Sequence, residues 1–88
     1  AGKLSKIQTF YPDGAKEKLG LYRSGLEEGD TVLFFPNGKE KERTPYRNGR
    51  MHGVQKIYGE DGQLLIERVF EEGKLVETDE SVVWKSEE

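Results

Sequence analysis

His52 is the only histidine of this 88-residue chain, and its side chain is the best candidate for a general base near neutral pH. A nucleophilic relay would need a serine or cysteine and an orienting acid, and neither stands at a suitable spacing from His52. The chain has no cysteine, and one histidine with scattered carboxylates does not supply the converging ligands of a metal site. We therefore expect no catalytic residue, no metal and no cofactor. We interpret His52 as an exposed residue at the end of a strand.

A basic stretch in the middle of the chain is a second candidate site. Phosphate contacts combined with aromatic stacking are typical of nucleic-acid and anionic-lipid sites, and Phe34 and Tyr58 lie close by. Glu40 and Glu42 interrupt the stretch, so the simpler interpretation is a charged strand surface that keeps a sheet soluble. The patch predicted for an anionic ligand comprises Arg43, Arg47, Arg50, His52 and Lys56.

Acidic residues gather in the last third of the chain. Residues 1–58 contain 11 Lys and Arg against 7 Asp and Glu, whereas residues 59–88 contain 3 against 10, within a net charge of −3. Such an acidic region can steer a protein partner that has a basic surface. The residues predicted to bind this partner are Glu71, Glu72, Glu77, Asp79 and Glu80.

The elements that would carry these residues repeat with a period of 24. Two glycine series and one aromatic series follow it: Gly14, Gly38 and Gly62; Gly25, Gly49 and Gly73; and Tyr22, Tyr46 and Phe70. A period of this length is typical of stacked units, none of which buries its apolar face alone. The predicted units are residues 5–28, 29–52 and 53–76, followed by a degenerate cap at 77–84 and a frayed tail at 85–88.

Turn chemistry predicts that each unit is a β-hairpin. Asn37-Gly38 and Asn48-Gly49 are the turn dipeptides of the middle unit, and both favour a two-residue type I′ turn. Glu72-Gly73 fits that turn poorly and is interpreted as a different turn type. The segments between turns read as seven strands, at 4–11, 15–23, 26–35, 39–47, 50–59, 63–71 and 74–84. With 33% hydrophobic and 35% charged residues, the core must be thin. The predicted fold is therefore all-β: a single-layer antiparallel meander, elongated and twisted.

Counting outward from two-residue turns also predicts the register. Gly29 then lies opposite Tyr46, Gly53 opposite Phe70, and Ser5 opposite Tyr22, so that a ring covers the backbone beside each small residue. The same count makes both faces of the sheet partly apolar. One face carries Ile7, Tyr11, Tyr22, Leu33, Phe35, Tyr46, Met51, Ile57, Ile66 and Phe70; the other carries Phe10, Leu19, Leu21, Val32, Phe34, Val54, Tyr58, Leu65, Val69 and Trp84, with the basic residues between them.

The aligned units, FYPDGAKEKLGLYRSG, FFPNGKEKERTPYRNG and YGEDGQLLIERVFEEG, resemble MORN-type repeats, specifically the bacterial variant of antitoxin-like proteins. The resemblance covers nearly the whole chain. Departures occur at Thr31, Gln55 and Gly59, where an aromatic is expected, and at Glu77, which breaks the leading-glycine series. The resemblance implies a hairpin for each repeat, stacking into an elongated sheet, and a role in protein binding, with antitoxin or immunity functions in some members.

Three functions remain open. The first is a non-enzymatic protein-binding module, antitoxin-like or immunity-like, that uses a sheet face or the acidic last third. The second is a binder of nucleic acid or acidic lipid that uses the basic middle repeat. The third is an architectural or self-associating segment, for which the open sheet edges at 4–11 and 74–84 are suited.

Overall fold

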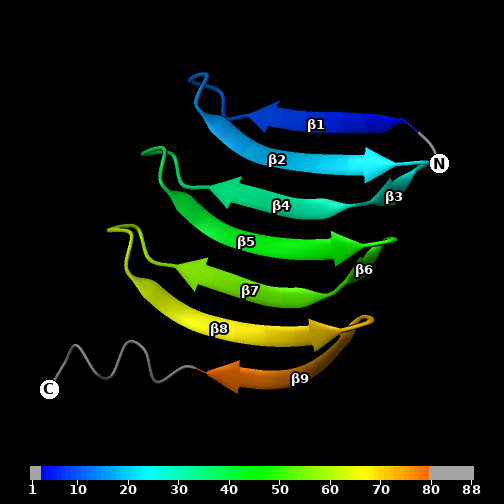
Figure 1. Cartoon of the computed structure of the whole chain (residues 1–88). Helices are drawn as coiled ribbons and strands as arrows, with labels where there is room; N and C mark the ends of the chain where they lie inside the picture. The colour runs from blue at the N-terminus through cyan, green and yellow to red at the C-terminus, as the bar shows by residue number, and fades with distance from the viewer. Residues whose placement is uncertain (1–2, 80–88) are drawn as a thin grey trace, which may run out of the picture.

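The computed structural model describes residues 3–79 (Figure 1). It confirms the all-β prediction, because all regular secondary structure in this range is β-strand. The strands are β1 (Leu4–Phe10), β2 (Lys16–Arg23), β3 (Leu26–Glu27), β4 (Gly29–Phe34), β5 (Glu40–Arg47), β6 (Arg50–Met51), β7 (Gly53–Tyr58), β8 (Leu64–Glu71) and β9 (Lys74–Asp79). The described part of the chain has no helix long and apolar enough to cross a membrane.

All strands belong to one antiparallel sheet with the order β1-β2-β4-β5-β7-β8-β9, in which β3 also pairs with β2 and β6 with β5. Neighbours in the sheet are therefore successive along the chain, as the predicted meander requires. The sheet is curved and forms a single layer, with extents of 48 × 37 × 12 Å (Figure 1). Short β3 and long β4 together form the third predicted strand, and β6 and β7 form the fifth.

The first turn of each hairpin differs from the predicted type I′ turn. In the middle unit, the Gly38 amide donates to the Phe35 carbonyl (2.9 Å) and the Phe35 amide donates to the Lys39 carbonyl (2.8 Å), so the loop has three residues. Gly38 has a φ of 91°, whereas Asn37 has no positive φ. This geometry is a type I turn followed by a left-handed glycine. The Asn37 side chain favours it, because its Oδ1 accepts a hydrogen bond from the Lys39 amide (2.9 Å). The same bonds recur at Asp13 and Asp61.

The second turns adopt the predicted two-residue type I′ geometry. Their first residues have positive φ, namely Ser24 (53°), Asn48 (51°) and Glu72 (49°), and a left-handed glycine follows each. The expectation of a different turn at Glu72 was therefore wrong. Two hydrogen bonds to the preceding unit hold this turn. The Glu72 amide donates to His52 Nδ1 (3.2 Å), and the Gly73 amide donates to the Met51 carbonyl (2.8 Å).

The predicted register of small and aromatic residues is confirmed. Ser5 lies opposite Tyr22, and the pairs Gly29 with Tyr46 and Gly53 with Phe70 repeat the arrangement. The count succeeded although the first turns are one residue longer than assumed. A β-bulge next to each of these turns restores the register, for example between Leu33 and Phe34.

The third strand is interrupted near its start. Tyr22 lies opposite Glu27, but Leu19, three residues earlier, lies opposite Val32, five residues later. The two additional residues are accommodated around Gly29, which has a φ of 82°, and the same shift recurs one period later. Counting from turns missed this shift. The predicted faces survive it, because side chains alternate along a strand with a period of two.

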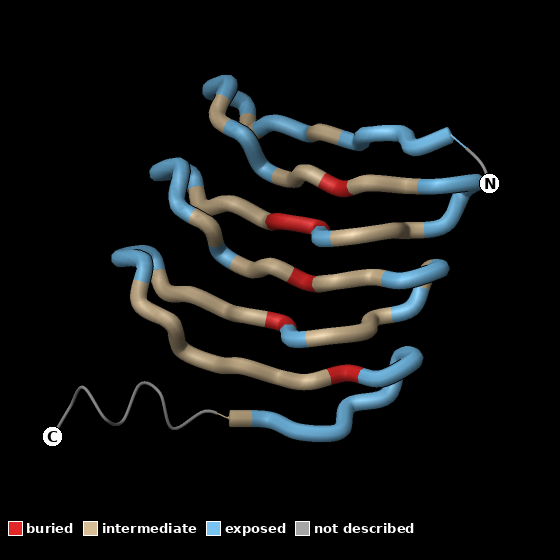
Figure 2. The backbone as a smooth tube through the Cα atoms, viewed as in Figure 1, coloured by how far each residue is buried: buried red, intermediate tan, exposed pale blue. Residues whose placement is uncertain are grey.

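The buried residues are few and lie within the inner strands, and the hairpin ends are exposed (Figure 2). The buried hydrophobic side chains of the described range are Val32 and Phe70, and the buried polar ones are Thr31, Thr44 and Gln55. The core is thus as thin as the composition predicts. The unit boundaries stay a prediction. Residues 80–88, which include Trp84 and the predicted tail, lie outside the described residues.

Candidate functional site

The two faces of the sheet differ in charge. Residues that lie opposite each other share a face, so Thr31, Thr44 and Tyr46 belong to one face, and Asp30, Val32 and Arg43 belong to the other. We call the face with Tyr22, Tyr46 and Phe70 the charge-poor face, because its charged strand residues are few: Lys18, Glu27, Glu42 and Arg68. The charge-rich face carries Lys6, Arg23, Asp30, Arg43, Arg47, Lys56, Glu67, Glu71, Glu77 and Asp79.

A line of hydrogen bonds crosses the centre of the charge-poor face. Gln55 Nε2 donates to Thr44 Oγ1 (3.0 Å), and both Gln55 Nε2 (3.3 Å) and Thr44 Oγ1 (3.1 Å) donate to Glu42 Oε2. Arg68 Nη1 donates to Gln55 Oε1 (3.4 Å). No buried side-chain polar atom of the described range lacks a hydrogen-bond partner. These groups therefore stabilise the thin centre of the sheet.

Sequence reasoning missed this network. Gln55 was noted only as a departure from the resemblance, and Thr44 was not considered. A signal existed, since Thr44 is one period from both Gly20 and Arg68 and all three fall on the central row of one face.

The aromatic residues Tyr46 and Phe70 lie on the same face, beside this row. Burial, followed by the nearby Glu27 and Glu42 carboxylates, raises the pKa of Tyr46 above its usual value, so its hydroxyl stays protonated at neutral pH. Phe70 is 8% exposed. Tyr46 lies opposite Gly29 and Phe70 lies opposite Gly53, as the register predicted.

The predicted anionic-ligand patch divides into separate ion pairs. Arg43 contacts Asp30 (2.8 Å) and Glu40 (2.6 Å). Lys56 lies 4.0 Å from Glu67. Each of these side chains faces a carboxylate of the same chain, which reduces the positive charge available to a phosphate ligand.

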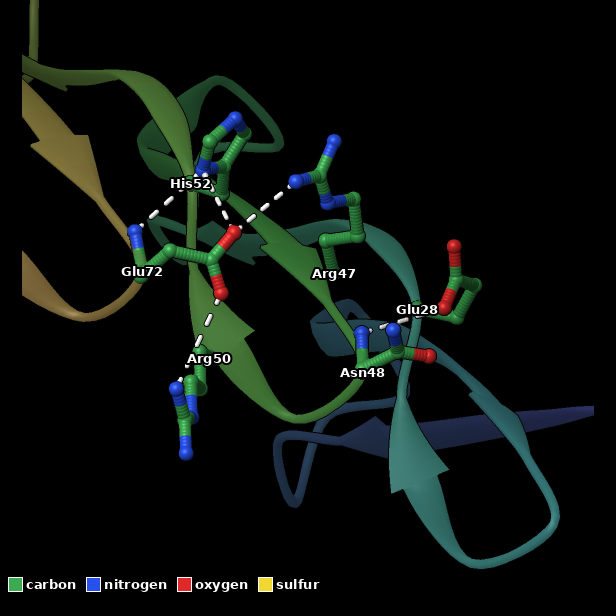
Figure 3. Close-up of polar contacts among 6 residues, drawn as sticks. All are labelled: Glu28, Arg47, Asn48, Arg50, His52 and Glu72. Carbon is green, nitrogen blue, oxygen red and sulfur yellow. Dashed lines mark hydrogen bonds and ion pairs between the residues drawn. The ribbon is translucent and has the colours of Figure 1, made fainter.

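Arg47, Arg50 and His52 gather around one carboxylate of the next unit, that of Glu72 (Figure 3). Arg47 Nη2 donates to Glu72 Oε2 at 2.8 Å, Arg50 Nη1 lies 3.7 Å from Oε1, and His52 Nδ1 lies 3.5 Å from Oε2. The hydrogen bond from Arg47 lowers the pKa of Glu72 below its usual value. Arg43 has the same effect on the pKa of Glu40. Both carboxylates are therefore ionised at neutral pH.

His52 contributes to the structure of a turn. Its Nδ1 accepts a hydrogen bond from the Glu72 amide, and 24 residues earlier Glu28 Oε1 accepts the equivalent bond from the Asn48 amide (3.2 Å; Figure 3). A carboxylate thus occupies the equivalent position in the preceding unit. The role of the His52 imidazole is therefore to accept a hydrogen bond from the turn. Within residues 3–79, no three His, Asp or Glu side chains are placed to hold a metal ion.

The structure brings some of the predicted partner-binding acids together and separates one. Glu77 lies opposite Val69 and Asp79 opposite Glu67, so both occupy the charge-rich face of β8 and β9. Glu71 is on the same face. Glu72 is in the turn, where it is engaged by the arginines, and Glu80 lies outside the described residues.

The family model of the MORN repeat variant matches residues 51–72, a segment that begins in β6 and ends in the turn after β8. Comparisons with curated proteins and with solved structures gave no match. The matched segment contains Gln55 and Gly59, two of the departures noted in the sequence. The preceding unit has the same turns, bulge and glycine–aromatic register as the matched one. Residues 51–72 are therefore similar to a MORN repeat variant, in agreement with the resemblance noted in the sequence.

Proposed function

We propose that the protein is a non-enzymatic binding module whose charge-poor face contacts a partner protein. The observation that carries the proposal is that this face combines apolar side chains with few charges, while the described chain supplies no second layer to cover it. A sheet with an apolar face is usually buried against another element. Apolar side chains that no other layer covers mark an interaction site in many proteins.

The side chains available to the partner lie beside the buried central row. Leu33, Ile57 and Ile66 are half-buried on the charge-poor face of three different strands, and Ile57 lies directly opposite Ile66. Side chains that are already partly ordered lose little conformational freedom on binding. Repeats extend such a surface along the sheet, as is common in repeat proteins.

The acidic last third of the chain indicates that the partner has a basic surface. Glu71 and Glu77 are exposed on the charge-rich face of the last two strands. We infer that they steer a partner with a basic surface during encounter, without being part of the apolar contact. An antitoxin or immunity role, in which the partner is a toxin, is the finer form of this hypothesis and rests on the family resemblance. Coexpression with a toxin candidate encoded by a neighbouring reading frame tests that form by growth rescue.

The binding face is tested with matched truncations. The partner is purified from the native source on the immobilised chain, and its dissociation rate is then measured with the purified partner. We expect Leu33→Ser and Ile66→Ser each to raise the dissociation rate about tenfold, which corresponds to about 1.4 kcal/mol. Val54→Ser is the control, because Val54 is 45% exposed on the charge-rich face. A larger effect of the Val54 variant would contradict the assignment of the face.

Binding to an anionic surface through the basic middle repeat is the second hypothesis, and the ion pairs of that region give it little support. Salt-dependent binding of RNA or acidic vesicles, lost in Arg50→Glu, would favour it over the first.

A further inference from the structure

β1 is an exposed edge strand with three large hydrophobic side chains. Leu4 is 51% exposed, Ile7 is 43% exposed and Phe10 is 55% exposed. One edge of β1 pairs with β2, and no strand of the described residues pairs with its other edge, at the top of the sheet in Figure 1. Backbone amides and carbonyls along that edge are therefore available to another strand.

The two edge strands of the sheet are protected to different degrees. Natural sheets discourage pairing at their edges with charged residues, prolines and short strands. β9 has charged residues at Lys74, Glu77 and Asp79 among its six positions. β1 has seven residues, Lys6 is the only charged one, and it contains no proline. Of the two edges, β1 is thus the one suited to strand addition.

We propose that β1 pairs with β1 of a second copy of this chain, antiparallel and centred on Ile7. In this register Ile7 lies opposite its counterpart, Leu4 lies opposite Phe10, and Lys6 lies opposite Gln8. Each exposed apolar residue then meets an apolar residue, and no like charges are directly opposite. The two Lys6 side chains are diagonal neighbours, with backbone positions about 7–8 Å apart.

The symmetry of the pair is consistent with the rest of the sheet. A twofold axis perpendicular to the sheet, midway between the two copies of Ile7, makes the new strands antiparallel, like every pair within the chain. Joining β1 of one copy to β9 of another by simple translation would instead give parallel strands, since both arrows point the same way in Figure 1. The twofold pair also keeps both charge-poor faces on one side of the extended sheet. The inference is independent of the proposed partner contact, because it uses an edge and leaves that face open.

Disulfide cross-linking tests the register directly, since the chain has no cysteine. We expect Ile7→Cys to form a covalent dimer under mild oxidation, because directly opposite residues have Cβ atoms about 4.5–5.5 Å apart. Phe10→Cys is the matched control on the same strand. Its two copies would be six residues apart along the edge, about 20 Å, and should not cross-link. Equal cross-linking of the two variants would overturn the proposed register.

Charge substitution at the same position tests the non-covalent dimer. Sedimentation should give twice the 10.1 kDa monomer mass for the unmodified chain and the monomer mass for Ile7→Lys and for Ile7→Glu alone. Mixing the two variants should restore a dimer, because opposite charges then meet at the axis. Circular dichroism confirms that each variant is folded. A monomeric unmodified chain, or a dimer that survives Ile7→Lys and is lost in Val76→Lys on β9, would overturn the proposal.

Discussion

Gly53 combines a backbone requirement with a close neighbour. Its φ of 120° is one that residues with a side chain rarely adopt, and a Cβ there would lie 3.1 Å from Pro45 Cγ. The predicted register placed the ring of Phe70 over the backbone beside Gly53. The positive φ directs the added atom toward Pro45 instead. The glycine–aromatic pairing is therefore present, and the reason for the glycine is different.

Gly53→Ala should destabilise the domain by about 1–3 kcal/mol, because it adds both backbone strain and crowding against Pro45. Urea unfolding measures the change. Gly20→Ala is the control, since Gly20 lacks a positive φ and its added Cβ would meet Thr31 Oγ1 at 3.4 Å, an ordinary contact. If Gly53→Ala unfolds at the same urea concentration as the unmodified chain, the strain is absent.

The hairpin turns show how each structural unit attaches to the next. At the first turns, the Asn37 side chain donates from Nδ2 to the carbonyl of Glu60 in the following hairpin (3.0 Å). At the second turns, the Gly49 amide donates back to the carbonyl of Glu27 (2.8 Å). Both ends of the strands are thus joined across units by hydrogen bonds. Such contacts compensate in part for the thin core, as nearest-neighbour interfaces do in repeat proteins.

The second turns differ in how well their first residue tolerates positive φ. Ser24→Asn should stabilise the chain by about 0.5 kcal/mol, because asparagine adopts the left-handed conformation more readily than serine. The reciprocal change, Asn48→Ser, should destabilise it by a similar amount, since Asn48 has nearly the same φ. Thermal unfolding of the two variants provides the comparison. Shifts of the same sign in both would show that turn conformation does not control the stability.

At the largest scale, residues 3–79 form a thin curved sheet whose charges are distributed unevenly. The charge-rich face holds the paired arginines in its middle and exposed acids near β9. The opposite face is charge-poor and has a satisfied polar centre. A single-layer sheet of this kind offers a large accessible surface, which suits recognition better than enclosure of a small molecule.

Reversing exposed acids should slow the encounter with a basic partner. We expect the double variant Glu71→Lys and Glu77→Lys to reduce the association rate about tenfold at low salt and to weaken its salt dependence, with little change in dissociation. Stopped-flow or surface-based kinetics measure both rates. Arg50→Glu is the comparison, because Arg50 is exposed and its contact with Glu72 is long. A larger loss of association in the Arg50 variant would transfer the site to the basic middle repeat.

Local chemistry within the sequence determined the architecture. The 24-residue period, the turn dipeptides and the alternation along strands predicted the meander, the two-residue turn at Asn48-Gly49, the two faces and the pairing of Gly53 with Phe70. Each first turn is one residue longer than predicted, and the bulge beside it compensates for that residue, so the register is unchanged. The shift near Gly29 is two residues, which leaves each side chain on its predicted face because side chains alternate with a period of two. The three-residue first turns and the two-residue shift at Gly29 were missed because a bulge cannot be recognised from turn residues alone.

Tertiary structure alone decided which charges are engaged. Arg47 and Glu72 are 25 residues apart, and Gln55 and Thr44 meet only because β7 pairs with β5. Composition divides the chain into a basic part and an acidic part, but stacking places an acid of the last unit against the basic residues of the unit before it. The contacts of a charged side chain depend on which strands become neighbours and on the side of the sheet it occupies. That information is present only once the units have stacked.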